Sequence, residues 1–205
     1  MKKVLTLAAA IALLVTMISV AAAETIVMKS GNAASGSQDP LITVRRLSLA
    51  AEPQQAIVAS SRDALWTHPP VGCTWVSTTT STQDIPGWYY YHTSFSLPSG
   101  FTNPSLTISW SGDDCAYLTL NATDLGYRDF WAVRTVTLND PSAFATGVNA
   151  LDFAVANTDI WPTSATGLCY YATVTYTSAP VPEPSSILAL AGGLLGLLGI
   201  RRFRR

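Results

Sequence analysis

The sequence predicts an all-β domain, an antiparallel β-sandwich or jelly roll, between two apolar end segments. Its central part consists of short runs in which apolar and polar residues alternate, and no convincing helical period appears. Gly, Pro, Asn and Asp separate these runs, which are rich in the strand-favouring residues Thr, Tyr and Trp. A period of two places one set of side chains on one face of a strand, as in a half-buried antiparallel sheet.

Eight segments are expected to form the strands. In one of them Leu106, Ile108 and Trp110 alternate with serine and threonine, so the three apolar side chains are expected to face the core. About 155 residues are enough to bury such a core, so no metal or cofactor is expected to support the fold. The expected strands are 41–49, 73–79, 94–97, 105–110, 116–121, 131–138, 151–156 and 168–176.

The N-terminal segment, residues 1–23, is predicted to be a helical signal peptide for Sec export. Lys2 and Lys3 form a positive start, and an apolar run follows to Val20. Ala21 and Ala23 supply the small side chains that signal peptidase needs, so cleavage is expected after Ala23; a retained anchor is the alternative. Residues 24–35 are then expected to lead into a sandwich domain at 36–177.

The C-terminal segment is predicted to be a short transmembrane helix. A proline-rich linker, 178–184, precedes an uncharged apolar run at 185–200. This run would span about 24 Å as a helix, short of a hydrocarbon core of roughly 30 Å, and snorkelling arginines would make up the difference. The basic tail, 201–205, is expected to stay cytoplasmic under the positive-inside rule. Its four arginines are Arg201, Arg202, Arg204 and Arg205.

The same tail resembles a known sorting signal. The order of Val181, Pro182, Glu183 and Pro184, an apolar run with glycines, and then arginines is similar to the PEP-CTERM family. The resemblance implies a Gram-negative bacterium that makes exopolysaccharide, and processing by an exosortase near the Pro-Glu-Pro element. It also implies an inner-membrane intermediate, followed by release to the cell surface or the extracellular matrix.

A second resemblance covers most of the central part. Segments 36–40, 90–97, 112–114, 117–121 and 147–153 follow one another as in galactose-binding-like β-sandwiches. One departure is Asn121-Ala122, where that family usually has Asn-Gly. Three cysteines allow three different pairs. The resemblance makes the first and last strands neighbours, and so implies a disulfide between Cys73 and Cys169, with Cys115 left over.

Composition argues against several kinds of function. Between Glu24 and Pro180 six basic residues face 12 acidic ones, so a nucleic-acid partner is not expected. His68 and His92 are the only histidines, and no cysteine or carboxylate stands at zinc-ligand spacing. The adjacent Asp113 and Asp114 are expected to point to opposite faces. With no nucleophile elbow or phosphate-binding glycine loop, the chain is not expected to be an enzyme.

Aromatic residues give the strongest indication of a ligand. Five aromatic residues lie near expected loops or strand ends, where their rings could stack on sugars: Trp66, Trp88, Tyr89, Trp131 and Trp161. Most tryptophans of a β-sandwich nevertheless pack in its core or at its rim. The leading hypothesis is a non-catalytic surface or matrix protein, structural or adhesive, with exopolysaccharide as partner. The alternative is a carbohydrate-binding module with aromatic platforms at one end of the sandwich, and a hydrolase ranks third.

Overall fold

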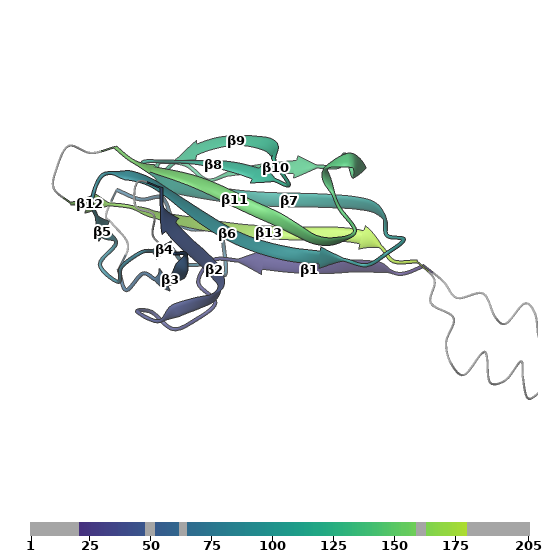
Figure 1. Cartoon of the computed structure of the whole chain (residues 1–205), viewed down its shortest axis with the longest axis horizontal. Coiled ribbons are helices and arrows are strands. Elements are labelled where there is room, and N and C mark those ends of the chain that lie inside the picture. Colours follow the sequence, from purple (N-terminus) through teal and green to yellow (C-terminus); the bar gives the residue numbers. More distant parts are fainter. Residues whose placement is uncertain (1–20, 48–51, 62–64, 159–162, 180–205) are drawn as a thin grey trace, which may run out of the picture. The chain divides into compact units, whose positions relative to one another are not determined.

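The computed structural model describes residues 21–47, 52–61, 65–158 and 163–179, and one compact unit runs from Ala23 to Thr177 (Figure 1). The signal segment 1–20, the sorting motif, the apolar run at 185–200 and the arginine tail lie outside the described residues. Among the residues described, no helix is long and apolar enough to span a membrane.

The described unit is built from strands, with one short 3-10 turn, η1. Ordered along the chain, these elements are β1 Ala23–Lys29, β2 Gln38–Arg46, β3 Gln54–Val58, β4 Val76–Ser77, β5 Gln83–Asp84, β6 Gly87–Leu97, β7 Thr102–Asp113, β8 Cys115–Leu120, β9 Thr123–Asp129, β10 Arg134–Leu138, η1 Pro141–Ala143, β11 Gly147–Asn157, β12 Ser164–Ala165 and β13 Gly167–Thr177.

The strands form an antiparallel sandwich, as the sequence predicts. One layer has the order β1-β13-β7-β10 and the other the order β2-β6-β11-β8-β9, and the short β3 and β4 connect them along one side. The long strands β6 and β11 pair in one layer and β7 and β13 in the other, and all four extend along the length of the domain in Figure 1. Buried side chains from both layers form one cluster; for example, Phe153 of β11 meets Tyr170 of β13 with ring centroids 5.0 Å apart.

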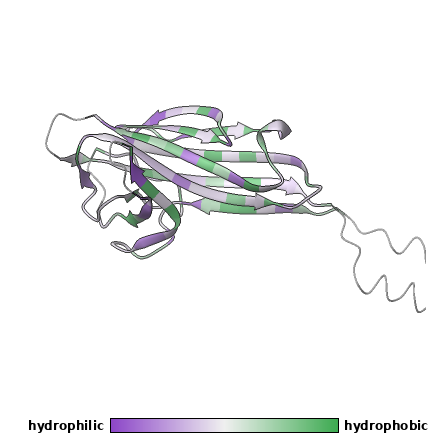
Figure 2. Ribbon diagram, in the orientation of Figure 1, coloured by the Kyte–Doolittle hydropathy of each residue, from purple (hydrophilic) through white to green (hydrophobic). Residues whose placement is uncertain are grey.

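Alternation along each strand decides which face is buried. In β6 the side chains of Tyr89, Tyr91 and Phe95 are buried, whereas Trp88 and His92 are exposed. Figure 2 shows the same alternation of hydrophobic and hydrophilic residues along the long strands. The hydrophobic effect therefore fixes the register, because a slip by one residue would exchange the two faces.

The structure corrects the expected start of the sandwich. Residues 24–35 were expected to be a lead-in, but Ala23–Lys29 form β1, which pairs with β13 from Ala23 opposite Thr177 to Lys29 opposite Tyr171. The run of Thr25 to Met28 has no clear alternation, because an edge strand with little burial does not need it. The chain therefore enters and leaves the sandwich at the same end.

Other strand boundaries also differ from the prediction. Only Val76–Ser77 of the expected strand at 73–79 pairs in the sheet, because Trp75 packs against Trp66 in a separate small core. The mostly polar β9 and the short β3 were not expected. Strand β9 follows β8 after only two residues, so its place in the sheet comes from the hairpin and not from a hydrophobic pattern.

The turn between β8 and β9 leads to a prediction about stability. Asn121 and Ala122 both have positive φ, +47° and +69°, which is the type I′ geometry that favours Asn-Gly. Alanine is strained in this left-handed region, so Ala122→Gly is expected to raise the free energy of unfolding by about 0.5–1 kcal/mol in urea titrations. Ala132→Gly, at an exposed alanine without positive φ, is the control and should give no gain; equal gains would contradict this account.

Candidate functional site

A row of side chains crosses the outward face of one layer. Strand register places Arg45 opposite Tyr90, Tyr90 opposite Ala154, Ala154 opposite Tyr117, and Tyr117 opposite Tyr127. One residue from each of five neighbouring strands thus lies in line. At about 4.8 Å per strand, the part from Tyr90 to Tyr127 is roughly 14 Å long.

Trp88 joins this row and completes what we call the aromatic strip, the rings of Trp88, Tyr90, Tyr117 and Tyr127. The Trp88 and Tyr117 centroids are 6.0 Å apart, and Tyr117 stacks on Tyr127 at 5.4 Å. Trp88, Tyr117 and Tyr127 are 40%, 45% and 53% exposed, which leaves ring surface open to solvent. Arg45 lies over the Tyr90 ring at 5.7 Å and ends the strip on the β2 side.

Small and polar side chains surround the strip. Ala154 and Ala156 of β11 lie between the aromatic strands in register, so no bulky group rises among the rings. In the next row His92 Nδ1 is 2.7 Å from Asp152 Oδ1, and both side chains are about half exposed. Thr119, opposite Asp152, extends this polar row. The face therefore combines open rings with hydrogen-bonding groups at their side.

The outward face of the other layer differs in character. Its register rows are dominated by hydroxyl side chains: Thr173 of β13 lies opposite Thr107 of β7, which lies opposite Thr137 of β10. The Thr107 and Thr137 hydroxyls are 3.2 Å apart, and those of Ser109 and Thr135 are 2.7 Å apart. The aromatic strip thus belongs to one of the two outward faces.

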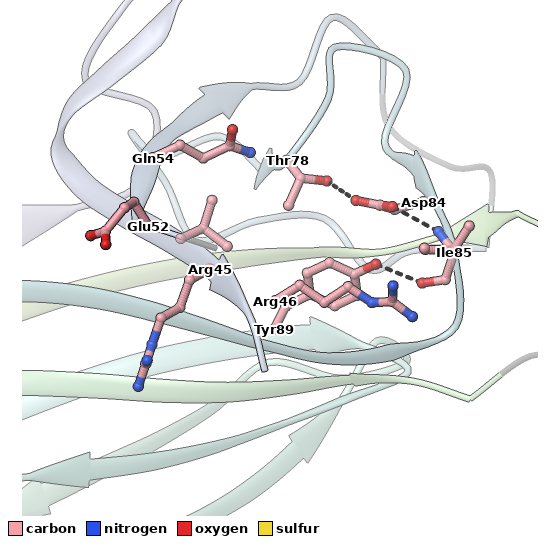
Figure 3. Close-up of a pocket in the computed structure, with 9 residues that line it drawn as sticks. Arg45, Arg46, Glu52, Gln54, Thr78, Asp84, Ile85 and Tyr89 are labelled. Atoms are coloured by element: carbon pink, nitrogen blue, oxygen red, sulfur yellow. Dashed lines mark hydrogen bonds between the residues drawn. The ribbon is translucent and has the colours of Figure 1, made fainter. Parts of the chain in front are cut away.

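A pocket of about 210 Å³ opens beside the β2 end of the strip (Figure 3). Its lining combines an apolar part with charged and polar groups, and the Thr78 hydroxyl donates to Asp84. In Figure 3, Gln54, Thr78 and Asp84 lie on one side and Tyr89 on the other, while Arg45 extends away. The lining residues are Val44, Arg45, Arg46, Glu52, Gln54, Thr78, Asp84, Ile85 and Tyr89.

Several contacts hold the pocket wall in place. The Tyr89 hydroxyl donates to Ile85 O at 2.6 Å; burial, and then the charge of Asp84, raise the pKa of Tyr89, which keeps this donor protonated. Asn157 Nδ2 donates to Asp84 O at 3.2 Å. Arg46 Nη2 donates to Pro86 O. Gly87 has a φ of +154°, which side chains disfavour, and a Cβ there would lie 2.8 Å from Arg46 Nε, so a larger residue would displace the Arg46 side chain.

Comparison with known proteins identifies the C-terminal tail. Residues 180–205 match the family described as the PEP-CTERM protein-sorting motif. The chain carries a PEP-CTERM sorting motif. The resemblance of the tail to this signal is thereby confirmed, and the motif marks an exported, exosortase-processed cell-surface protein. No curated protein matches the chain.

Solved structures similar to this chain include part of a larger enzyme and isolated modules. The FMN-binding beta-glucuronidase from Facaelibacterium prausnitzii L2-6 has TM-score 0.42 and 14% identity, over 76% of this chain and 23% of that one. The CBM36-1 domain of a xylanase from the hindgut metagenome of Trinervitermes trinervoides has TM-score 0.34 and 10% identity, over 77% and 100%. A family 35 carbohydrate binding module from an environmental isolate has TM-score 0.30 and 15% identity, over 69% and 98%.

The chain spans about a quarter of the length of the glucuronidase, and 30% of the similar Uncultured Clostridium sp. beta-glucuronidase. At these identities the likeness concerns the fold alone.

The structure places the four predicted tryptophan platforms in different surroundings. Trp66 is 2% exposed, packs on Trp75 at 4.1 Å and donates from Nε1 to Asp113 at 2.7 Å, so the prediction of an open ring there is wrong. Trp131 is 62% exposed in the turn after β9 and packs on Phe130. Trp88 belongs to the strip, and Trp161 lies outside the described residues.

Tyr90, Tyr117 and Tyr127 were not singled out from the sequence. Their signal was present in β6, where Trp88, Tyr90 and His92 alternate with Tyr89 and Tyr91 and so share an outward face. Tyr117 and Tyr127 could be added only once the pairing of β8 with β9 and β11 was known.

Residues that carried the galactose-binding-like resemblance make structural contacts. Asp113 accepts from Trp66, whereas Asp114 Oδ2 accepts from Thr158 N at 2.5 Å, so the two carboxylates have separate partners. Asn121 Nδ2 donates to Asn149 Oδ1 at 2.8 Å and ties the β8–β9 turn to the start of β11. Within the described ranges, no group of three His, Cys, Asp or Glu side chains is arranged to hold a metal ion.

The implied disulfide is a further correction. Cys73, Cys115 and Cys169 are all free thiols in this structure, and Cys73 Sγ donates to Pro70 O at 2.9 Å instead of bonding to Cys169. Burial raises the pKa of Cys73 from 9.0 to about 11, and burial followed by the nearby Cys73 raises the pKa of Cys169. The folded protein thus favours neutral thiols.

The raised pKa of Cys73 predicts that the stability of the fold depends on pH. Because the pKa of Cys73 is higher in the folded than in the unfolded chain, its contribution to stability is present below pH 9 and is lost as the pH rises from about 9 to about 11. Urea titrations across this range should show the loss, with a smaller loss in Cys73→Ser. Alkylation of Cys73 and Cys169 at pH 8, located by peptide mapping, should be much slower in the native protein than in urea; equal rates would contradict the burial of these two thiols.

Proposed function

We propose that this exported, exosortase-sorted protein is a non-catalytic structural or adhesive component of the cell surface or extracellular matrix, and that it holds exopolysaccharide on the aromatic strip. The supporting observation is the in-register row of Tyr90, Tyr117 and Tyr127, extended by Trp88, on one outward face. An extended sugar chain matches a linear strip, because each sugar ring can lay its C–H face on an open aromatic ring.

The surroundings of the strip favour this ligand. Sugar hydroxyls both donate and accept hydrogen bonds, and the paired His92 and Asp152 beside the rings offer both functions. A partner protein would require a broader apolar area than this narrow row provides. The PEP-CTERM resemblance implies a bacterium that makes exopolysaccharide, so an exported protein of this kind would meet the proposed ligand outside the cell.

The proposal assigns binding and not hydrolysis to the sandwich. A glycosidase uses two carboxyl groups, one of which must deliver a proton to the leaving oxygen. Glu52 and Asp84 both line the pocket, but the Asp84 oxygens already accept from the Thr78 hydroxyl and from Ile85 N, at 2.7 Å in the latter case. These bonds suit a fixed acceptor that shapes the pocket better than a proton donor.

Cosedimentation tests the proposed function. The processed protein released by the producing bacterium is mixed with that bacterium's purified exopolysaccharide, and bound protein is measured after centrifugation. We expect saturable binding that free monosaccharides compete for only weakly, since a single ring cannot cover a strip of roughly 14 Å. A reducing-end assay on the same mixture should stay at background. Absence of binding, or steady release of reducing ends, would refute the proposal.

A further inference from the structure

We propose that the pocket beside the aromatic strip holds a single uncharged sugar ring, a branch or terminal residue of the polysaccharide whose main chain lies on the strip. This inference rests on the proposed function and adds the ligand's chemistry to it. A binder with strip and pocket together would recognise a branched or end-exposed polysaccharide in preference to an unbranched one.

The size of the pocket sets the size of the ligand. Its volume of about 210 Å³ is below the roughly 300–1,000 Å³ that is usual for sites holding drug-sized ligands. A space of this size suits one pyranose ring with its hydroxyls, and not a run of main chain.

The charges of the lining favour a neutral ligand. Arg45 and Arg46 contribute two positive charges, and Glu52 and Asp84 two negative ones, so the lining is balanced. A uronate carboxylate would meet Glu52 and Asp84, and an amino sugar would meet the two arginines. A neutral ring is repelled by neither sign of charge, and its hydroxyls can accept from guanidinium or donate to carboxylate.

The walls match the two sides of a sugar ring. Val44, Ile85 and the Tyr89 ring supply apolar surface for C–H groups. Across the pocket from Tyr89, Asp84 is fixed by Thr78, so an acceptor is held in place before any ligand arrives (Figure 3). The Glu52 and Gln54 side chains make no hydrogen bond with any other residue that the structure describes, and they remain available for sugar hydroxyls.

The pocket and the strip are joined through two strands. Arg45 of β2 lines the pocket and lies over the Tyr90 ring at 5.7 Å, so it belongs to both. In β6, Tyr89 faces the pocket while its neighbours Trp88 and Tyr90 face outward in the strip. Because adjacent residues of a strand point to opposite faces, a branch leaving a main chain at Trp88 and Tyr90 has to pass around β2 beside Arg45 to reach the pocket.

The test compares two forms of one ligand. The producing bacterium's exopolysaccharide is used intact and after trimming by periodate oxidation, borohydride reduction and mild acid, which remove residues that carry vicinal hydroxyls; size-exclusion chromatography selects trimmed polymer whose main chain is still long. Affinity is measured with the processed, secreted wild-type protein. The same form is used for the pocket variant Glu52→Gln/Gln54→Ala and for the strip variant Tyr117→Ala. Both pocket residues are exposed, so the pocket variant should keep the fold, which circular dichroism and thermal unfolding check.

We expect trimming to weaken binding by the wild type about tenfold. The pocket variant should bind both forms equally, at the affinity of the wild type for the trimmed form, while the strip variant should bind both forms more weakly and keep the tenfold preference. The preference should change little between low and high salt, because a neutral ring is not held by charge.

An unchanged wild-type affinity after trimming, or a pocket variant that keeps the preference, would overturn the pocket assignment and leave the strip proposal standing. A preference lost at high salt would show a charged group in the pocket and overturn the neutral assignment. Failure of the wild type to bind either form would overturn both proposals.

Discussion

Replacing Trp88 and Tyr117 together with alanine is expected to lower the affinity for exopolysaccharide about a hundredfold. Each ring is roughly half exposed and contributes to one continuous surface, with centroids 6.0 Å apart. Truncation of a partly exposed aromatic residue in an interface commonly costs about 2 kcal/mol of binding free energy or less. A loss of about 1.4 kcal/mol corresponds to a tenfold weaker affinity. Two such losses give the expected hundredfold change.

Each single alanine variant of the strip should bind the polysaccharide about tenfold more weakly. The position of the ring in the strip decides which variant loses most. Tyr117 lies between Trp88 and Tyr127, so its loss divides the strip, whereas loss of Tyr127 only shortens it. Tyr117→Ala should therefore weaken binding more than Tyr127→Ala. Affinity electrophoresis in gels containing graded amounts of the polysaccharide measures all the variants under one condition.

A matched control exists on the other outward face. Tyr171 of β13 is a partly exposed tyrosine opposite Ser109, in the layer without the strip. Tyr171→Ala removes the same number of atoms and should bind as the wild type does. If Tyr171→Ala weakened binding as much as Tyr117→Ala, or if the double variant kept wild-type affinity, the strip would not be the binding surface.

The sequence was sufficient to predict the sandwich because burial enforces alternation in its central strands. Leu106, Ile108 and Trp110 are all at most 1% exposed, as their spacing requires. Edge strands are under no such constraint. Strand β1 was missed because its backbone is held by pairing with β13 and only Met28 is fully buried. Hydrophobic pattern alone does not reveal strands of this kind.

The candidate site was less predictable than the fold, since it is assembled from strands far apart in the chain. Trp88 and Tyr117 are 29 positions apart and meet only because β11 lies between β6 and β8. Trp66 shows the reverse error. Its position in a loop indicated exposure, yet a hydrogen bond to Asp113 and packing on Trp75 bury it. Which tryptophans remain open depends on the strand order.

Trp110→Ala is expected to have the largest effect on stability, a loss of about 3–5 kcal/mol in the free energy of unfolding. The Trp110 side chain is fully buried in β7, and Nε1 donates to Ala116 O at 3.1 Å. Truncation leaves a cavity between the layers and removes the donor from a buried carbonyl. For a domain of this size the melting temperature should fall by roughly 6–20 °C.

Two other variants separate the causes of this loss. Trp110→Phe keeps most of the ring and removes the donor, so it should cost about 1–2 kcal/mol. Trp131→Ala removes an exposed indole and should cost less than about 1 kcal/mol. A loss below 1 kcal/mol in Trp110→Ala would contradict the packing described for the core.

Trp110→Ala should also affect polysaccharide binding at the aromatic strip, because the Trp110 ring supports β9. The Arg128 guanidinium lies over the Trp110 ring at 5.0 Å, and Arg128 Nη1 donates to Tyr127 O. Because β9 pairs only with β8, the Trp110 ring is one of few anchors for this edge strand and for Tyr127. Trp110→Ala should therefore weaken polysaccharide binding several-fold even where the protein is fully folded, while Trp110→Phe, which keeps a ring beneath Arg128, should bind nearly as the wild type does.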